Sequence, residues 1–300
     1  MPDLPDIRPY EYLFTGRIDS AILPDTERTI QMLRLDLLHP VVSGNKWFKL
    51  KYNLRQAALE EKQVILTFGG AYSNHLIATA AAAQASGLKS IGIVRGLHAE
   101  AAMTPTLQAC QEYGMQLQFV SREAYRFLKT GEGMASVQEQ YPHAFIVPEG
   151  GNNEQGLRGA MEIAAYIPGT ITHVAVSVGS GCTFAGIRKA LHPSVKLLGF
   201  VPMKQGRYLA DDWQLEQENY ALIDDYHLGG FGKCTDELIA FMNQFYQINN
   251  IPLDRVYTAK MMMGLQHLIQ QNHFPKEASI LAIHTGGTQG NSSIDDKLLQ

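Results

Sequence analysis

Residues 43–51 read Ser-Gly-Asn-Lys-Trp-Phe-Lys-Leu-Lys, a Gly-Asn turn followed at once by a lysine and then by an apolar pattern that continues through Leu54 and Ala57. The pattern predicts a helix that begins near Lys46. The N-terminal end of a helix carries partial positive charge, and a second ammonium at Lys49 adds repulsion. Both effects favour the neutral amine of Lys46, the form that attacks an aldehyde to give a Schiff base. Because most lysines at helix starts are solvated surface groups, this hypothesis depends on the other motifs of the chain.

The composition is that of an ordinary enzyme. The chain has 300 residues, 45% of them hydrophobic and 18% charged, which is enough for a substantial core and two lobes. A net charge of −4 argues against a nucleic-acid or anionic-membrane surface. The longest apolar stretch, residues 77–85, is short and rich in alanine, so no membrane span is expected.

Cysteine usage and the first residues bear on the compartment. The three cysteines, Cys110, Cys182 and Cys234, are far apart and match neither a metal-ligand nor a disulfide framework. They predict a reducing, cytoplasmic location and no metal site. Residues 1–6 lack a basic segment followed by an apolar run, so we expect no signal peptide.

Apolar β-rich runs alternate with helical segments along the whole chain. The predicted strands are residues 29–36, 63–68, 90–94, 116–120, 144–147, 171–177, 195–201, 220–223 and 280–284. The predicted helices include residues 73–86, 104–113, 155–165, 184–191 and 235–249. Nearly continuous apolar strands separated by helices are typical of parallel sheets covered on both faces, so the class is α/β. Nine strands suit two sheets better than one, which predicts two lobes with a cleft between them.

A glycine-rich segment, residues 178–183, follows one strand and opens a helix. Its small residues let backbone N–H groups curl around an anion, and the hydroxyls of Ser180 and Thr183 add donors. A tight strand-to-helix turn explains the same residues about equally well. If a ligand binds, the segment predicts a phosphate.

Two other phosphate motifs do not fit this segment. A P-loop needs Gly-Lys-Ser/Thr at its end, where Gly181-Cys182-Thr183 stands. A dinucleotide fingerprint needs a third glycine, where Phe184 stands, and an acidic residue after the next strand, where residues 201–204 supply none. A compact monophosphate is therefore favoured over a nucleotide.

A second loop, residues 69–75, reads Gly-Gly-Ala-Tyr-Ser-Asn-His between a strand and an alanine-rich helix. Ser73 alone is explained as a helix N-cap. With Asn74 and His75 it also supplies a hydroxyl, a carboxamide and an imidazole to one small anionic substrate. A lone histidine in such a place is more often a satisfied helix residue than a ligand-binding one.

Two later segments complete the candidate site. Residues 253–260 place Tyr257 before a methionine-rich helix whose run 261–263 we interpret as core. Tyr257 itself could be a core aromatic. Residues 283–290 end the last strand, where an open α/β sheet places its ligands. The run 229–233, Gly-Gly-Phe-Gly-Lys, is interpreted as a loop near the cleft.

Taken in order, these motifs resemble the pyridoxal-phosphate (PLP) enzymes of the D-cysteine desulfhydrase and 1-aminocyclopropane-1-carboxylate (ACC) deaminase family. The matching segments are Gly-Asn-Lys at 44–46, Gly-Gly-x-x-Ser-Asn at 69–74, Gly-Ser-Gly-x-Thr at 179–183, Val-Tyr-Thr-x-Lys at 256–260 and His-Thr-Gly-Gly at 284–287. The resemblance covers nearly the whole chain. It implies the tryptophan-synthase-β-like fold, PLP fold type II, with two lobes of mostly parallel twisted sheets flanked by helices.

The resemblance also implies roles for individual residues. Lys46 would carry PLP as a Schiff base, and Asn74 would hydrogen-bond its phenolic oxygen. The phosphate would be held by Gly179, Ser180, Gly181, Cys182 and Thr183. Thr258 would face the pyridine nitrogen, and Tyr257 would be a second acid/base or a positioning group. The substrate would meet Ser73, Asn74, His75, Tyr257, Thr285 and Gly286.

The family pattern further implies an organisation of the chain. Residues 49–154 would form a smaller domain that carries the Ser73-Asn74 loop, and residues 1–48 with 155–300 a larger PLP-binding domain. A homodimer is expected, with a small amino acid as substrate and neither nucleic acid nor membrane as partner. Tyr72 departs from the family, which often has glutamine there, and the chain is short for either enzyme.

The expected reaction is elimination. Lys46, once displaced by the substrate amine, would move the α-proton, a leaving group would depart from the β-carbon, and water would release ammonia and a 2-oxo acid. ACC deaminases carry glutamate where Thr258 stands and leucine where Thr285 stands. The two threonines of this chain therefore favour β-elimination from D-cysteine or a related D-amino acid, giving pyruvate. ACC deamination to 2-oxobutanoate is the alternative. Phe184, which stands where a dinucleotide fingerprint needs glycine, argues against a nucleotide-dependent oxidoreductase. The presence of Ser73 and Tyr257 argues against a non-catalytic PLP-binding relative.

Overall fold

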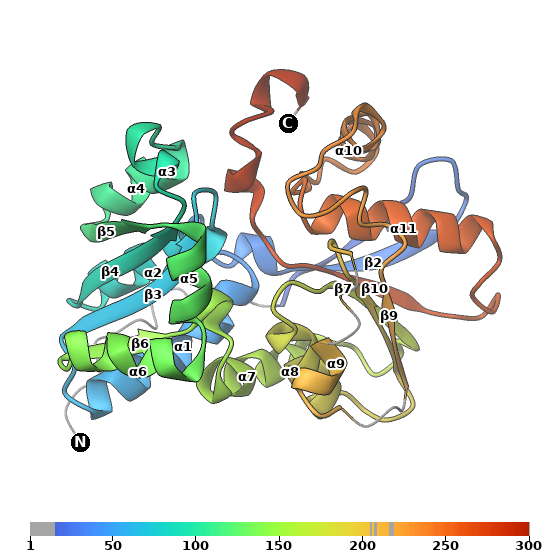
Figure 1. Cartoon of the computed structure of the whole chain (residues 1–300). Coiled ribbons are helices and arrows are strands. Elements are labelled where there is room, and N and C mark those ends of the chain that lie inside the picture. The colour runs from blue at the N-terminus through green and yellow to red at the C-terminus, as the bar shows by residue number, and fades with distance from the viewer. Residues whose placement is uncertain (1–15, 205, 207–208, 216–218, 300) are drawn as a thin grey trace.

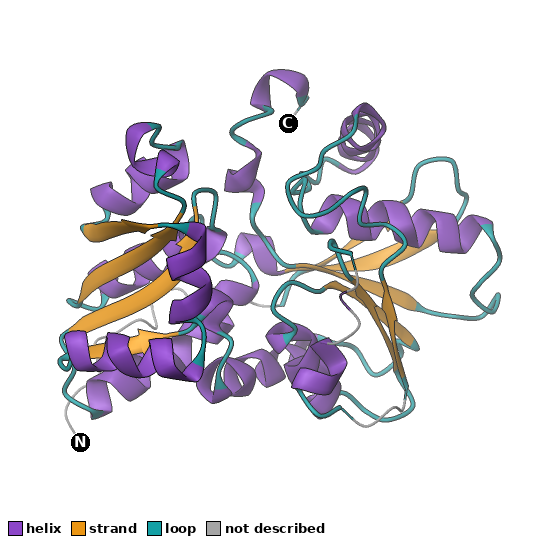
Figure 2. Cartoon of the chain, viewed as in Figure 1, coloured by secondary structure: helices purple, strands orange, loops and turns teal. Residues whose placement is uncertain are grey.

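A computed structural model describes residues 16–204, 206, 209–215 and 219–299 of the chain. Within these residues ten strands form two separate sheets, and helices flank both (Figures 1 and 2). The predicted α/β class, with mostly parallel sheets flanked by helices, is confirmed. Residues 1–6, on which the expectation about a signal peptide rests, lie outside the described part.

The smaller sheet has the strand order β5-β4-β3-β6, with every pair parallel. Its strands are β3 (Val64–Gly70), β4 (Lys89–Arg95), β5 (Met115–Val120) and β6 (Ala144–Val147). Its helices are α2 (Asn74–Ala85), α3 (His98–Ala101), α4 (Pro105–Glu112), α5 (Arg122–Leu128) and α6 (Gly131–Gln140). Successive strand residues face opposite sides, so Val94 packs with α2 and α4, and Ile93 with α5 and α6.

The larger sheet has the order β1-β2-β10-β7-β8-β9. Its strands are β1 (Ile18–Ile22), β2 (Thr29–Arg34), β7 (His173–Ser177), β8 (Lys196–Phe200), β9 (Tyr220–Ile223) and β10 (Ile280–His284). Only β1 pairs antiparallel, at one edge, among the described strands. The sequence analysis missed β1, a short edge strand with one buried residue, because it lacks an apolar run.

Helices cover both faces of this larger sheet. They are α7 (Glu154–Met161), α8 (Cys182–Ala190), α9 (Leu209–Asp212), α10 (Asp236–Asn249) and α11 (Thr258–Gln270). In Figure 1, α7 and α8 lie on the opposite side of the sheet from α10 and α11. The methionines 261–263 of α11 are buried in the core together with side chains of α10, as the sequence predicted.

Helix α1 (Asn45–Leu59) packs on α7, and α7 packs on α8. Two glycines permit this close approach: a Cβ on Gly159 would lie 1.8 Å from the Phe48 carbonyl oxygen, and one on Gly186 would lie 2.5 Å from the Ala160 Cβ. The helix that carries Lys46 is thereby fixed against the helix that follows the glycine-rich segment 178–183.

Several helices differ from the sequence expectation, and the short helices α3 and α9 were not predicted. Helices α5 and α6 were not predicted, because each buries only one or two side-chain positions and lacks a clear apolar period. The helix predicted at 155–165 is α7 followed by a 3-10 turn, Glu162–Tyr166. The smaller sheet lies within residues 49–154, but that domain boundary stays a prediction.

Candidate active site

The start of α1 lies directly on the chain that follows β10. Gly44 adopts φ +64°, and a Cβ there would lie 1.8 Å from the Thr285 carbonyl oxygen, so only glycine fits. The same carbonyl accepts a hydrogen bond from the Asn45 backbone N–H at 3.3 Å. The Gly-Asn-Lys motif and the segment at 284–287 are therefore joined through the backbone.

The Asn45 side chain connects two further motifs. Its Nδ2 donates to Thr183 Oγ1 at 2.8 Å, and its Oδ1 accepts from Lys46 Nζ at 2.8 Å. Asn45 thus links the lysine to the glycine-rich segment. Sequence reasoning included Asn45 in a motif but gave it no role.

The environment of Lys46 favours its neutral amine. The pKa of Lys46 is lowered to about 7, first by burial among protein atoms and then by the like charge of Lys49, although Asp254 acts in the opposite direction. The repulsion from Lys49 was predicted from sequence. The larger effect, burial, was not, because it depends on chain segments that are distant in sequence.

Lys49 lies in the same site. Its side chain is 3% exposed, and its Nζ donates to Ser180 Oγ at 3.2 Å. Burial lowers its pKa, and it forms no ion pair with any residue in the described part of the chain. The sequence analysis treated Lys49 only as a neighbour of Lys46. Its i, i+3 spacing from Lys46 was the signal that both side chains share one face of the helix.

The predicted phosphate-binding segment forms a compact turn at the carboxyl end of β7. Gly181 has φ +81° and caps α8, which begins at Cys182, two residues earlier than predicted. Cys182 is fully buried, and its Sγ donates to the Gly151 carbonyl at 3.4 Å. A Cβ on Gly179 would lie 3.2 Å from the Tyr257 ring. The turn therefore contacts both the smaller sheet's loops and Tyr257.

Sequence reasoning missed one loop of this site. After β6, Gly150 and Gly151 both have positive φ, and a Cβ on Gly150 would lie 3.3 Å from Ser180 Oγ. A Cβ on Gly151 would lie 3.3 Å from the Lys49 side chain. A Gly-Gly pair separated by two residues from the end of a predicted strand was the signal that could have found it.

The loop before α2 meets the larger sheet through Asn74. Ser73 is the N-cap of α2, and its Oγ accepts from the Leu76 N–H at 3.3 Å, the structural role already considered. Asn74 Nδ2 donates to the Gly287 carbonyl at 3.4 Å, while its buried Oδ1 has no partner within the described chain. A buried amide atom without a partner is typical of a site that receives a ligand.

His75 is 3% exposed and neutral. Burial lowers its pKa well below the ordinary value. The Thr67 hydroxyl donates to the Val147 carbonyl at 2.7 Å, so at 2.8 Å it accepts the proton of His75 Nε2. That nitrogen is satisfied inside the smaller lobe, and a substrate contact of His75 stays a prediction.

Asp254 organises the start of α11. Its carboxylate accepts from the N–H groups of Val256, Tyr257 and Thr258 at 2.7–3.0 Å and from the Thr258 hydroxyl at 2.7 Å. Thr258 is fully buried. The Thr258 hydroxyl has a single proton and donates it to Asp254, so the hydroxyl has no proton left for a cofactor nitrogen. The predicted contact of Thr258 with that nitrogen would require the hydroxyl to rotate.

Tyr257 stays protonated. Burial and the negative charges of Asp254 and Glu149 raise the pKa of Tyr257 above its usual range. Its ring lies against Gly179 of the phosphate-binding turn. At neutral pH the hydroxyl is therefore a proton or hydrogen-bond donor.

Thr285 and Gly286 close the site from the end of β10. The Thr285 carbonyl holds Asn45, as described, and the residue is 8% exposed. Gly286 has φ +76°, and a Cβ there would lie 2.4 Å from Ser43 Oγ. Gly286 thus has a packing role, and substrate contacts of both residues stay predictions.

The assembled site can hold a phosphate and present a neutral amine. The turn at 179–183 and the buried ammonium of Lys49 offer donors to an anion, and Lys46 is positioned to react with an aldehyde. Among the described residues, no three His, Cys, Asp or Glu side chains gather in a way that could hold a metal ion. None of the described helices is long and apolar enough to cross a membrane.

Residues 28–286 match the model of the family described as "Pyridoxal-phosphate dependent enzyme". The chain belongs to this family, and its cofactor is PLP. The site fits PLP on structural grounds: a lysine whose pKa is lowered to about 7, a glycine-rich turn beside the buried Lys49 amine, and the buried carboxamide oxygen of Asn74, which has no partner in the described chain. Lys46, the turn at 179–183 and Asn74 are the residues that would hold the group, and their roles stay predictions.

Two curated relatives carry different names. A Pyrococcus horikoshii protein provisionally named 1-aminocyclopropane-1-carboxylate deaminase is 28% identical over 92% of this chain and 91% of its own length. A Klebsiella pneumoniae D-cysteine desulfhydrase is 29% identical over 87% of each. The crystal structure of an ACC deaminase homologue superposes with a TM-score of 0.82 at 24% identity, over 95% of this chain and 93% of that one. The fold is therefore that of PLP fold type II.

The lowered pKa of Lys46 is testable in the cofactor-free protein. Acetylation of Lys46 by acetic anhydride, followed by peptide mass spectrometry, should show a titration midpoint near pH 7. Lys49→Gln should raise this midpoint, because removing a like charge favours the ammonium. The matched control is Lys51→Gln. Lys51 lies on the same helix as Lys49 and donates to Glu162, and its replacement should leave the Lys46 midpoint unchanged. An unchanged midpoint in Lys49→Gln would contradict the assigned cause.

Proposed function

We propose that this PLP enzyme catalyses β-elimination from D-cysteine or a related small D-amino acid, giving pyruvate, ammonia and the leaving group. The observation that carries the proposal is the Lys46 amine, with its lowered pKa, held by Asn45 beside the turn at 179–183, with the protonated Tyr257 ring packed against Gly179 of that turn. The Klebsiella relative, named D-cysteine desulfhydrase, supports this choice of substrate.

Lys46 would act as the base at the substrate α-carbon. Bound PLP supplies the electron sink that stabilises negative charge at that carbon. An amine with a pKa near 7 can both accept the α-proton and return it within the working pH range. Asn45 Oδ1 accepts from the Lys46 amine and so orients its lone pair.

The other residues would bind and position the substrate. Ser73 and Asn74 would receive the carboxylate at the start of α2, with His75 behind them. Tyr257 would donate its proton or a hydrogen bond near the β-carbon, where the leaving group departs. Thr285 would present a polar wall beside Gly286.

ACC deamination is the second candidate, and the name of the Pyrococcus relative favours it. By the family resemblance, ACC deaminases carry a glutamate and a leucine where this chain has Thr258 and Thr285. The Thr258 hydroxyl here is bonded to Asp254 and is neutral. Without a carboxylate at that position the site is less suited to opening an unactivated ring, so we favour β-elimination.

We also propose that residues 49–154 form a domain inserted between residues 1–48 and 155–300, and that the enzyme is a cytoplasmic homodimer. The smaller sheet, from Val64 to Val147, lies inside the proposed domain. Cys110, Cys182 and Cys234 are free thiols, which suits a reducing compartment. The dimer rests on the family resemblance.

Lys46 should be the residue that binds PLP covalently. Borohydride treatment of the yellow PLP-loaded protein should bleach its visible band and leave a pyridoxyl label on Lys46. Lys46→Ala should abolish turnover while retaining the circular dichroism spectrum, because this side chain contributes little to the core. Recovery of the label on Lys49 or Lys260 would refute the assignment.

Assays with a panel of three amino acids decide between the two candidate reactions. Pyruvate should be released from D-cysteine and from β-chloro-D-alanine, while 2-oxobutanoate release from ACC should be negligible. Both products are measured as 2-oxo acids with the same coupled assay. Robust ring opening of ACC by the unmodified enzyme would overturn the preference for β-elimination.

Tyr257→Phe should lower kcat by about 100-fold, the usual contribution of one acid/base group, and leave the PLP content unchanged. Steady-state kinetics with D-cysteine, whose thiolate leaving group takes up a proton, beside the absorbance of bound PLP, measures both. Tyr246→Phe on α10 serves as a matched control that should keep full activity. A Tyr257→Phe enzyme with unaltered kcat would remove Tyr257 from the chemistry.

A further inference from the structure

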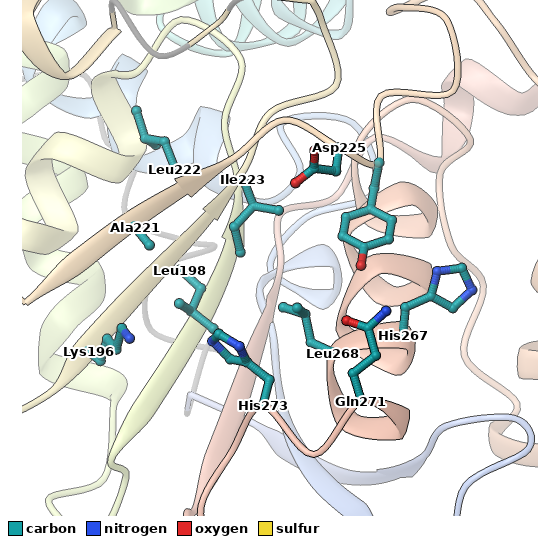
Figure 3. A pocket seen from close by; sticks show the side chains of 11 residues that line it. Lys196, Leu198, Ala221, Leu222, Ile223, Asp225, His267, Leu268, Gln271 and His273 are labelled. Carbon is teal, nitrogen blue, oxygen red and sulfur yellow. The ribbon is translucent and has the colours of Figure 1, made fainter.

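One face of α11 holds the segment that follows β9. Lys260, Gly264 and His267 lie at i, i+4 and i+7 and therefore share a face. A Cβ on Gly264 would lie 2.7 Å from the Tyr226 ring, which also lies 5.5 Å from the His267 ring. Tyr226 and His267 line a cavity of about 610 Å³. Figure 3 shows the His267 side chain in this pocket. Tyr226 thus anchors the beginning of the segment on α11.

The next residues form a tight turn that Lys260 holds. Lys260 Nζ donates to the carbonyls of His227 at 3.0 Å and Gly230 at 2.7 Å. The Gly230 N–H closes the turn on the His227 carbonyl at 2.9 Å. Leu228 has φ +50°, and Gly230 has φ +124°, a conformation that strongly favours glycine.

Lys260 is an unusual group for this task. It is 2% exposed, and its ammonium is not ion-paired with any residue that the structure describes. Burial lowers its pKa to about 8. A charge buried without a counter-ion costs stability, whereas a methionine of similar shape would not. The two carbonyl bonds therefore point to a role in holding the turn.

The turn delivers Phe231 to the active site. The Phe231 ring packs edge-on against the Tyr257 ring, with 5.9 Å between centroids. Phe231 is 38% exposed, so core packing does not explain its place. Tyr257 is the N-cap of α11, three residues before Lys260. The same helix therefore carries Tyr257 and the lysine that fixes the ring packed on it.

We propose that Lys260 is a positioning residue, which holds the loop 227–231 so that Phe231 keeps the Tyr257 ring against Gly179. This rests on the role of Tyr257 under the proposed function. Among the described residues, no other charged side chain holds this loop; the two hydrogen bonds from Lys260 are called the tether below. With the tether removed, the turn at 227–230 would open, and the Tyr257 hydroxyl would lose its fixed orientation.

Lys260→Met tests the tether in the PLP-loaded enzyme. Hydrogen–deuterium exchange of the peptide 226–234 should rise about tenfold, as expected for losing one or two buried hydrogen bonds to a charged donor. For β-elimination, kcat should fall about tenfold, with KM and the PLP absorbance little changed. Lys233→Met, on an exposed side chain of the neighbouring turn, is the control and should change neither.

Phe231→Leu tests the route to Tyr257 and leaves the core intact. It should lower kcat about as much as Lys260→Met, and the double variant should be no slower than either. In a Tyr257→Phe background both substitutions should have no further effect on kcat. Additive losses, an unchanged kcat in Phe231→Leu, or unchanged exchange in Lys260→Met would each overturn the proposal.

The exchange measurement separates this proposal from the proposed function. If the enzyme does not act on D-amino acids, every variant and the unmodified enzyme are inactive on them. The exchange of peptide 226–234 in Lys260→Met would still rise if the tether exists. Exchange that stays at the level of the unmodified enzyme would refute the tether whatever the reaction is.

Discussion

The contact between Gly44 and Thr285 is the constraint on which the rest of the site depends. The backbone of α1 can approach the end of β10 only because Gly44 has no Cβ and adopts a positive φ. This approach places Asn45 between the Thr285 carbonyl and the Thr183 hydroxyl. The first turn of α1 is then fixed, so that Lys46 Nζ reaches Asn45 Oδ1 and Lys49 Nζ reaches Ser180 in the turn at 179–183.

The electrostatics of the site follow from this placement. Burial lowers the pKa of both lysines, and the like charge of Lys49 lowers the pKa of Lys46 further. Burial keeps the Cys182 thiol and the Tyr257 hydroxyl protonated and keeps His75 neutral. The donors around Lys49 thus face no acidic partner among the described residues, which fits the proposal that a phosphate group is held here. Lys46, the less buried lysine by exposed surface, is left free to change its protonation state.

Much of this architecture is predictable from sequence, and the exceptions have physical causes. Apolar runs reveal buried parallel strands, the segment at 284–287 was expected at a ligand-binding strand end, and the family resemblance placed the motifs at 44–46 and 179–183 in the same site. The edge strand β1 and the surface helices α5 and α6 bury too little to leave a pattern. The burial of Lys46 and the bond between Thr258 and Asp254 depend on three-dimensional packing, which spacing along the chain does not encode.

Helix α11 carries Lys260 and has as its N-cap Tyr257, the residue that Lys260 is proposed to position. Its first turn, capped by Asp254, sets the backbone of Tyr257, but a capped backbone leaves the tyrosine ring free to turn about its side-chain bonds. A second contact must therefore fix the ring, and Phe231 provides it. Phe231 comes from a turn with unfavourable backbone angles at Leu228, which needs a compensating interaction to persist. Lys260 supplies that interaction from the same helix, so the position of the tyrosine and the conformation of the loop are set together.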